Sequence, residues 1–189
     1  MNSTFYPVAN NQHAIKVTNS IQEWCGQVFM QLNNNNQFDI QSYSYFESEA
    51  DQKFSLDNVV LENELFTQLR IDPKSLPIGS HSIIPDFTYL RLKHKEVKAY
   101  VANITNTLEH GINTYTITYP ELDRTLSIHF TAEFPHTIES WNETYPDDYG
   151  NNAKKLTTTA ILKQRKMMAY WTKNKAKDSI LRRALELKQ

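Results

Sequence analysis

Hydrophobic and polar residues alternate with a period of two along residues 114–119, where three threonines separate two tyrosines and an isoleucine. The same alternation continues along residues 125–130. A period of two that is carried by β-branched and aromatic residues is typical of strands that bury one face. The sequence therefore predicts two strands here, joined by a turn at residues 120–123 that begins with a proline.

Other segments of the chain show a weaker form of this pattern. Further strands are predicted at residues 27–32, 37–46, 86–92, 97–104, 137–144 and 155–166. The four asparagines at residues 33–36 predict a hairpin loop, because asparagine tolerates left-handed backbone angles. The connections between the strands are too short for parallel crossovers, so the pattern favours an antiparallel meander.

Two segments have the spacing of helices instead. Residues 58–70 carry apolar side chains at helical intervals, with Asp57 or Asn58 available as the N-terminal cap and two prolines downstream. Residues 178–187 carry a second apolar stripe. A helix of this length is marginal alone, so we expect it to pack on the sheet.

These elements predict one mainly β domain over residues 1–189. We expect an antiparallel meander that curls to a half-barrel or barrel, with one internal and one C-terminal helix. A chain of 189 residues with 40% hydrophobic residues can bury roughly 70% of its unfolded surface. The composition excludes a disordered chain, and no apolar stretch approaches the ~20 residues of a membrane-spanning helix.

The net charge of −1 hides a strong asymmetry along the chain. Residues 154–189 hold 11 of the 20 lysines and arginines but only two acidic residues. We expect this basic segment to dock on the acidic body, with residues 172–189 forming a short docking helix. The alternative is an anionic membrane surface. A pI near 6.6 argues against nucleic acid as a partner.

The single cysteine, Cys25, cannot form an internal disulfide and so assigns no compartment. Next to Trp24, it is expected to be a buried small hydrophobic residue. Residues 1–17 lack the basic start, apolar core and cleavage site of a signal peptide. The chain is therefore expected to be cytoplasmic, or to begin downstream of an export signal.

Several catalytic motifs are absent from the sequence. It holds no glycine-rich nucleotide loop, no Gly-x-Ser-x-Gly elbow and no His-Glu-x-x-His. His129 and Glu139 could face each other across a turn, near His136, as an acid–base pair or a metal site. We expect these histidines to be ordinary sheet residues, and we assign no metal ion, no cofactor and no catalytic residue.

A cluster of carboxylates is the strongest candidate for chemistry. Its acidic residues are Glu139, Glu143, Asp147 and Asp148, and Trp141, Tyr145 and Tyr149 lie between them. Aromatic side chains beside carboxylates suit sugar binding or glycoside hydrolysis. The simpler interpretation is a solvated loop whose aromatic residues cover the edge of the sheet.

Aromatic residues at alternating positions could also line a cavity for an apolar ligand. The candidate ligand-binding residues are Tyr89, Tyr100, Tyr115, Tyr119, Phe130 and Trp141. Packing of the core explains the same pattern.

Five sequence stretches point to a known family. They are STFYPVANNQH at residues 3–13, SIQEWCG at 20–26, LRIDP at 69–73, YPEL with RTL at 119–126, and ETY at 143–145. Across most of the chain, these motifs resemble an uncharacterised Bacteroidota family of predicted exported lipoproteins, often labelled "septum formation inhibitor Maf". Members of that family carry a lipoprotein signal, so the resemblance implies the periplasm or the outer membrane.

The label itself does not fit this sequence. Maf proteins are nucleotide pyrophosphatases with an α/β fold and a Ser-x-x-Arg-Arg loop, and this chain has no such loop. We treat the label as a misannotation and transfer no catalytic residue from it.

We therefore expect a non-enzymatic protein of the cell envelope. Its curved sheet would bind an apolar small molecule or an envelope protein. The alternative is an enzyme, either a hydrolase that uses the carboxylates of residues 139–148 or the nucleotide pyrophosphatase that the family label implies.

Overall fold

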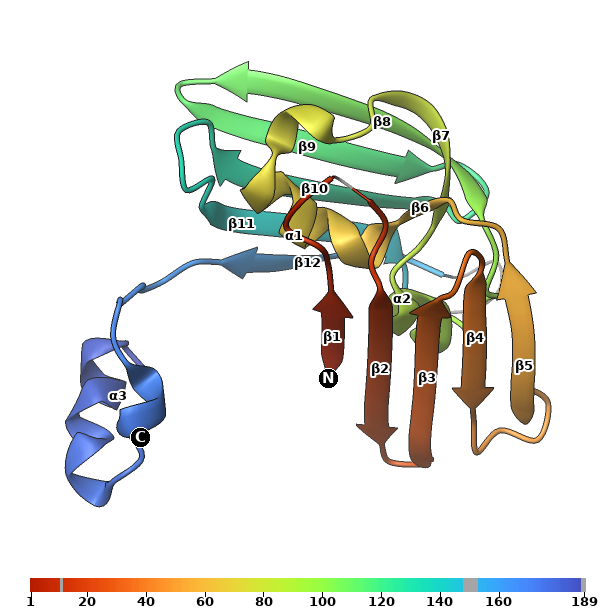
Figure 1. The fold of residues 1–189 in the computed structure, drawn as a ribbon, viewed down its shortest axis with the longest axis horizontal. Coiled ribbons are helices and arrows are strands. Elements are labelled where there is room, and N and C mark those ends of the chain that lie inside the picture. The colour runs from red at the N-terminus through yellow and green to blue at the C-terminus, as the bar shows by residue number, and fades with distance from the viewer. Residues whose placement is uncertain (11, 148–152, 188–189) are drawn as a thin grey trace.

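A computed structural model describes residues 1–10, 12–147 and 153–187, and shows two β-sheets (Figure 1). The first sheet is an antiparallel meander in which each strand pairs with the next along the chain. Its strands are β1 (Asn2–Phe5), β2 (Lys16–Glu23), β3 (Gly26–Asn34), β4 (Phe38–Tyr43) and β5 (Asp51–Leu56). The loop between β3 and β4 contains Asn36 at a φ of 73°, which confirms the predicted asparagine hairpin.

The second sheet holds most of the strands that alternation predicts. Their order is β12–β11–β10–β9–β8–β7–β6, and only β6 and β7 are parallel. The strands are β6 (Val60–Leu61), β7 (Gly79–Ile84), β8 (Tyr100–Glu109), β9 (Ile112–Tyr119), β10 (Arg124–Thr131), β11 (Ile138–Pro146) and β12 (Lys155–Ile161).

The mainly β class and the antiparallel meander are confirmed, but the sheets do not close into a barrel. The described strands form two open sheets, each with two unpaired edges. In Figure 1 the strands of the two sheets run in crossing directions. One hydrophobic core extends through both sheets, and it includes Leu32 of β3 and Ile128 of β10.

Helix α1 (Glu62–Ile71) confirms the internal helix predicted from the sequence. Its Leu65 and Leu69 are fully buried in the shared core. Asp57 and Asn58 do not cap it, because the helix begins later, after Leu61. Its first turn is closed by the Glu64 side chain, which accepts a hydrogen bond from the Leu61 backbone N–H at 3.1 Å.

The strand predicted at residues 86–92 is wrong, because the segment forms helix α2 (Phe87–Leu92). Asp86 caps this helix by accepting a hydrogen bond from the Thr88 backbone N–H at 2.7 Å. The helix buries Phe87, Tyr89 and Leu90 together. It packs beside β2, where the Asn19 amide donates to the Thr88 hydroxyl at 2.9 Å.

The C-terminal segment does not dock as predicted. β12 ends at Ile161. Between there and residue 187, the only helical elements are α3 (Ile180–Ala184) and two 3-10 turns, Tyr170–Thr172 and Ala176–Ser179. Residues 162–187 contain no buried side chain, and Figure 1 shows α3 away from both sheets. We call residues 162–187 the C-terminal arm.

Cys25 is also not where the sequence placed it. It lies exposed in the turn between β2 and β3, and its neighbour Trp24 is fully exposed. None of the helices in the described residues combines the length and apolar character that a membrane span requires.

Candidate functional site

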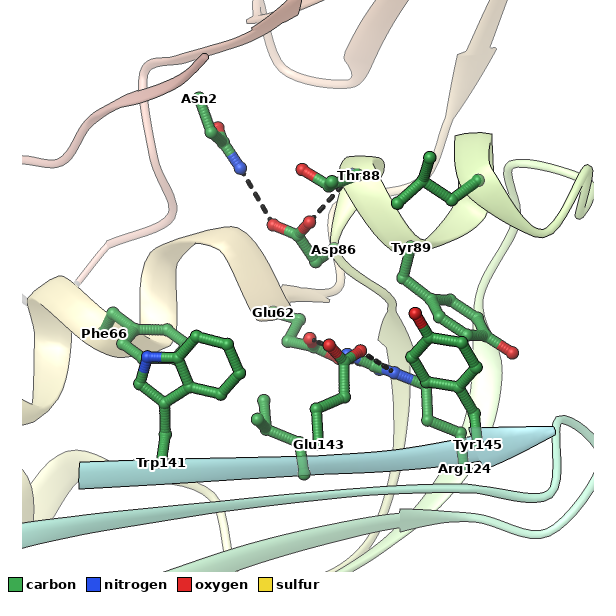
Figure 2. Close-up of a pocket in the computed structure, with 12 residues that line it drawn as sticks. Asn2, Glu62, Phe66, Asp86, Thr88, Tyr89, Arg124, Trp141, Glu143 and Tyr145 are labelled. Carbon is green, nitrogen blue, oxygen red and sulfur yellow. Dashed lines mark hydrogen bonds and ion pairs between the residues drawn. The ribbon is translucent and has the colours of Figure 1, made fainter. Parts of the chain in front are cut away.

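A pocket of about 290 Å³ lies where β10 and β11 of the second sheet meet α1, α2 and the start of β1 (Figure 2). Larger hollows exist, including one of about 690 Å³ beside the end of α1. We treat the smaller pocket as the candidate site because it combines aromatic walls with buried charges. Its polar lining includes Glu62, Asp86, Arg124 and Glu143.

Arg124 is the centre of the charged group. Nη1 and Nη2 donate to the two carboxylate oxygens of Glu62, each at 2.6 Å, and Nε donates to Glu143 Oε1 at 2.7 Å. The Arg124 side chain is 1% exposed and that of Glu62 is 2% exposed. A bidentate ion pair so far from water is held in one geometry by several charge-assisted hydrogen bonds.

Aromatic rings cover the Arg124 guanidinium. Its carbon lies 4.3 Å from the ring centroid of Tyr89 and 5.3 Å from that of Tyr119. The Tyr119 hydroxyl also donates to Glu62 Oε2 at 2.7 Å. Burial opposes the charge on Arg124, but the adjacent Glu62 and Glu143 hold its pKa well above the usual value.

The sheet register explains why an arginine stands in the core. Arg124 opens β10 directly after the turn, and it shares a face with Leu126 and Ile128, which are buried. Residues two apart lie on the same face of a strand, so Arg124 must point inward. A buried charge needs a partner, and Glu62 from the first turn of α1 supplies it.

Glu143 is the most accessible carboxylate of this ion-pair group, with 19% of its side chain exposed. It lies opposite Leu126 in the pairing of β10 with β11, so it faces the same side as Arg124. Burial raises the pKa of the Glu143 carboxyl, Arg124 lowers it, and Glu62 and Asp86 raise it further. The net effect is a raised pKa.

Asp86 reaches the pocket from the opposite wall, at the start of α2. Its Oδ2 accepts a hydrogen bond from the Asn2 amide at 2.8 Å and a second one from Asn63. Burial and the nearby Glu62 raise the pKa of Asp86. Asp86 thus joins β1, α1 and α2 around the pocket.

Aromatic side chains form the other walls. Phe66 and Trp141 lie together at one end of the hollow, and Tyr89 and Tyr145 lie at the other (Figure 2). The rings of Tyr89 and Tyr145 meet edge to face, with centroids 5.3 Å apart. The Glu143 carboxylate stands between these two aromatic groups.

The predicted ligand-binding residues divide into two groups. Tyr89 and Trp141 line the pocket. The other four are buried in the core: Tyr100, Tyr115, Tyr119 and Phe130. The three tyrosine hydroxyls donate hydrogen bonds within the protein, Tyr100 to Glu96 O, Tyr115 to Pro77 O and Tyr119 to Glu62. A ligand-binding role for these four stays a prediction.

The predicted carboxylate cluster is only partly assembled. Among its members, Glu143 lines the pocket, whereas Glu139 does not and Asp148 lies outside the described residues. The His129 ring nitrogens bond to Thr114 and Asn142, so His129 is not paired with Glu139. In the described part of the chain, no group of three His, Cys, Asp or Glu side chains is arranged to hold a metal ion.

Sequence reasoning missed Glu62, Asp86 and Arg124 as members of the site. One signal could have found Arg124: the alternation in β10 extends back to this residue and places its charge on the buried face. Nothing local indicates that Glu62, 62 positions earlier, is its partner.

Comparison of the chain with protein-family models, with curated proteins and with solved structures finds no match.

Proposed function

We propose that this protein is a non-enzymatic envelope protein that binds a small hydrophobic ligand in the pocket between the second sheet and helices α1 and α2. The placement of aromatic side chains on both sides of a hollow of about 290 Å³ carries the proposal. Ligand pockets usually have predominantly apolar or aromatic walls and a few fixed polar groups. The resemblance to exported lipoproteins supports the compartment.

The pocket dimensions limit the ligand. Small-molecule pockets start at roughly 300 Å³, so this one suits a molecule of one or two rings. Phe66 and Trp141 at one end and Tyr89 and Tyr145 at the other offer ring faces and edges to such a molecule. Each favourable aromatic contact contributes ~0.5–1.5 kcal/mol beyond the area that it buries.

A neutral fluorescent probe tests this function. We expect the two-ring probe 6-propionyl-2-(dimethylamino)naphthalene to bind with increased fluorescence, and we expect Trp141→Ala to weaken the binding because it removes one aromatic wall. Trp24→Ala is the matched control, since Trp24 is fully exposed in the β2–β3 turn. No binding, or the same loss of binding in both variants, would contradict the proposal.

The C-terminal arm supports a second function, contact with an anionic membrane surface. Met167, Tyr170 and Trp171 are 88%, 74% and 69% exposed, and lysines and arginines lie on either side of them in the sequence. Tryptophan and tyrosine prefer the membrane interface, and each basic residue near an anionic surface contributes about 1 kcal/mol.

Vesicle co-sedimentation tests this second function. The full chain should sediment with vesicles of phosphatidylglycerol and phosphatidylcholine but not with phosphatidylcholine alone. Trp171→Ala should reduce the bound fraction, whereas Trp24→Ala should not. Equal sedimentation with both vesicle types would dismiss the role of charge.

A further inference from the structure

The charges of the pocket indicate which polar group its ligand carries, an inference that rests on the proposed function. Arg124 is the first group to consider, because an arginine in a pocket commonly recognises an anion. Here its Nη1, Nη2 and Nε atoms already donate to Glu62 and Glu143. With the Tyr89 and Tyr119 rings over its guanidinium and only 1% of the side chain exposed, Arg124 is not presented to an anionic ligand.

The carboxylates outnumber this one cation. Glu62, Asp86 and Glu143 line the pocket together with Arg124, so the pocket is negative overall when all four groups are ionised. Two of the three acids are occupied within the protein. Glu62 accepts hydrogen bonds from Arg124 and Tyr119, and Asp86 accepts from Asn2, Asn63 and the Thr88 backbone.

Glu143 is the carboxylate that remains available to a ligand. Its Oε1 accepts from Arg124 Nε, whereas no described residue donates a hydrogen bond to its Oε2. The side chain is 19% exposed, compared with 2% for Glu62. Figure 2 shows its carboxylate in the hollow, with Trp141 on one side and Tyr145 on the other.

Aromatic rings beside a carboxylate form the surroundings in which a cation is most strongly held. The faces of tryptophan and tyrosine rings attract a cation by ~0.5–2 kcal/mol, more when water is excluded. A carboxylate at the same place adds a charge-assisted hydrogen bond for an ammonium N–H. An anion would meet three acids, and a neutral ligand without a hydrogen-bond donor would cover Glu143 Oε2 and leave this oxygen without a partner.

We propose that the pocket binds a small aromatic or apolar amine, with its cationic nitrogen paired with Glu143 and its ring between Trp141 and Tyr145. The ligand class is a one- or two-ring molecule that carries a protonated amine. Glu143 sets the preference for the cation, and the aromatic walls bind the ring.

Three indoles of similar shape but different charge test the proposal: tryptamine, neutral tryptophol and anionic indole-3-propionate. Isothermal titration calorimetry at pH 7 and low salt should show tryptamine binding about tenfold tighter than tryptophol, a difference of about 1.4 kcal/mol. Indole-3-propionate should bind more weakly than both. The affinity of tryptamine should fall with added salt, because salt screens a partly exposed ion pair.

Glu143→Gln should bring the affinities for tryptamine and tryptophol to within about twofold, while tryptophol binding is retained. Glu139→Gln makes the same charge change on the same strand outside the pocket and should keep the tenfold preference. The charge series on the unchanged protein tests the proposal even if Glu143→Gln does not fold.

The outcomes separate the two proposals. If neither the three indoles nor the two-ring naphthalene probe binds, the proposed function is wrong. If tryptophol or indole-3-propionate binds as tightly as tryptamine, the cation inference is wrong and the proposed function stands. If Glu139→Gln reduced the preference for tryptamine over tryptophol as much as Glu143→Gln does, that result would likewise contradict the role of Glu143.

Discussion

Removing the partner of the buried arginine is the most direct test of how this fold is held together. In Glu62→Gln the amide cannot neutralise Arg124, and one of the two 2.6 Å hydrogen bonds loses its acceptor. Breaking a buried ion pair by removing one partner costs ~3–5 kcal/mol. We expect the lower end, about 3 kcal/mol, because Glu143 still accepts a hydrogen bond from Arg124.

Urea and thermal unfolding measure this loss. For a chain of this length, ~3 kcal/mol lowers Tm by roughly 6–12 °C. The matched control is Glu121→Gln, which removes an exposed ion pair with Lys98 at 3.7 Å and should cost less than ~1 kcal/mol. A loss below about 1 kcal/mol in Glu62→Gln would contradict this prediction, because it would mean that the pair is not desolvated in the folded protein.

Two further predictions concern titration and backbone geometry. Because the pKa of Glu143 is raised, the folded protein keeps a proton that the unfolded chain has lost, so the free energy of unfolding should fall as pH rises from about 4.5 through the raised pKa. Urea unfolding from pH 4 to 8 should show a smaller fall in Glu143→Gln than in the unchanged protein. Parallel curves for the two proteins would contradict this. Gly26 has a φ of 155°, and an added Cβ would lie 2.6 Å from Tyr45 Cγ, so Gly26→Ala should cost ~1–3 kcal/mol. That loss should shrink in the double variant with Tyr45→Ala, and an unchanged loss would assign the cost to the backbone alone.

The alternation of the chain was sufficient to predict the central strands of the second sheet. β9 and β10 form where polar residues, mostly threonine, alternate with apolar ones, because a strand with this pattern can bury one face and expose the other to water. The same logic failed at residues 86–92. There Phe87 and Tyr89 also alternate, but Asp86 caps a helix that buries both of them with Leu90.

The candidate site could be predicted only in part. Trp141, Glu143 and Tyr145 occur at alternate positions of β11, so their common face follows from the sequence. Of the aromatic residues chosen as ligand contacts, Tyr89 reaches the pocket from a helix, not from the predicted strand.

The local elements follow from the order of residues alone, because strand alternation, the asparagine hairpin and the apolar stripe of α1 depend on neighbouring residues. The division of the strands into two sheets, the pairing of Glu62 with Arg124 and the position of α3 away from both sheets are known only from the fold. These arrangements depend on which segments, far apart in the sequence, bury their apolar surfaces against one another. The spacing of residues along the chain does not specify those contacts directly.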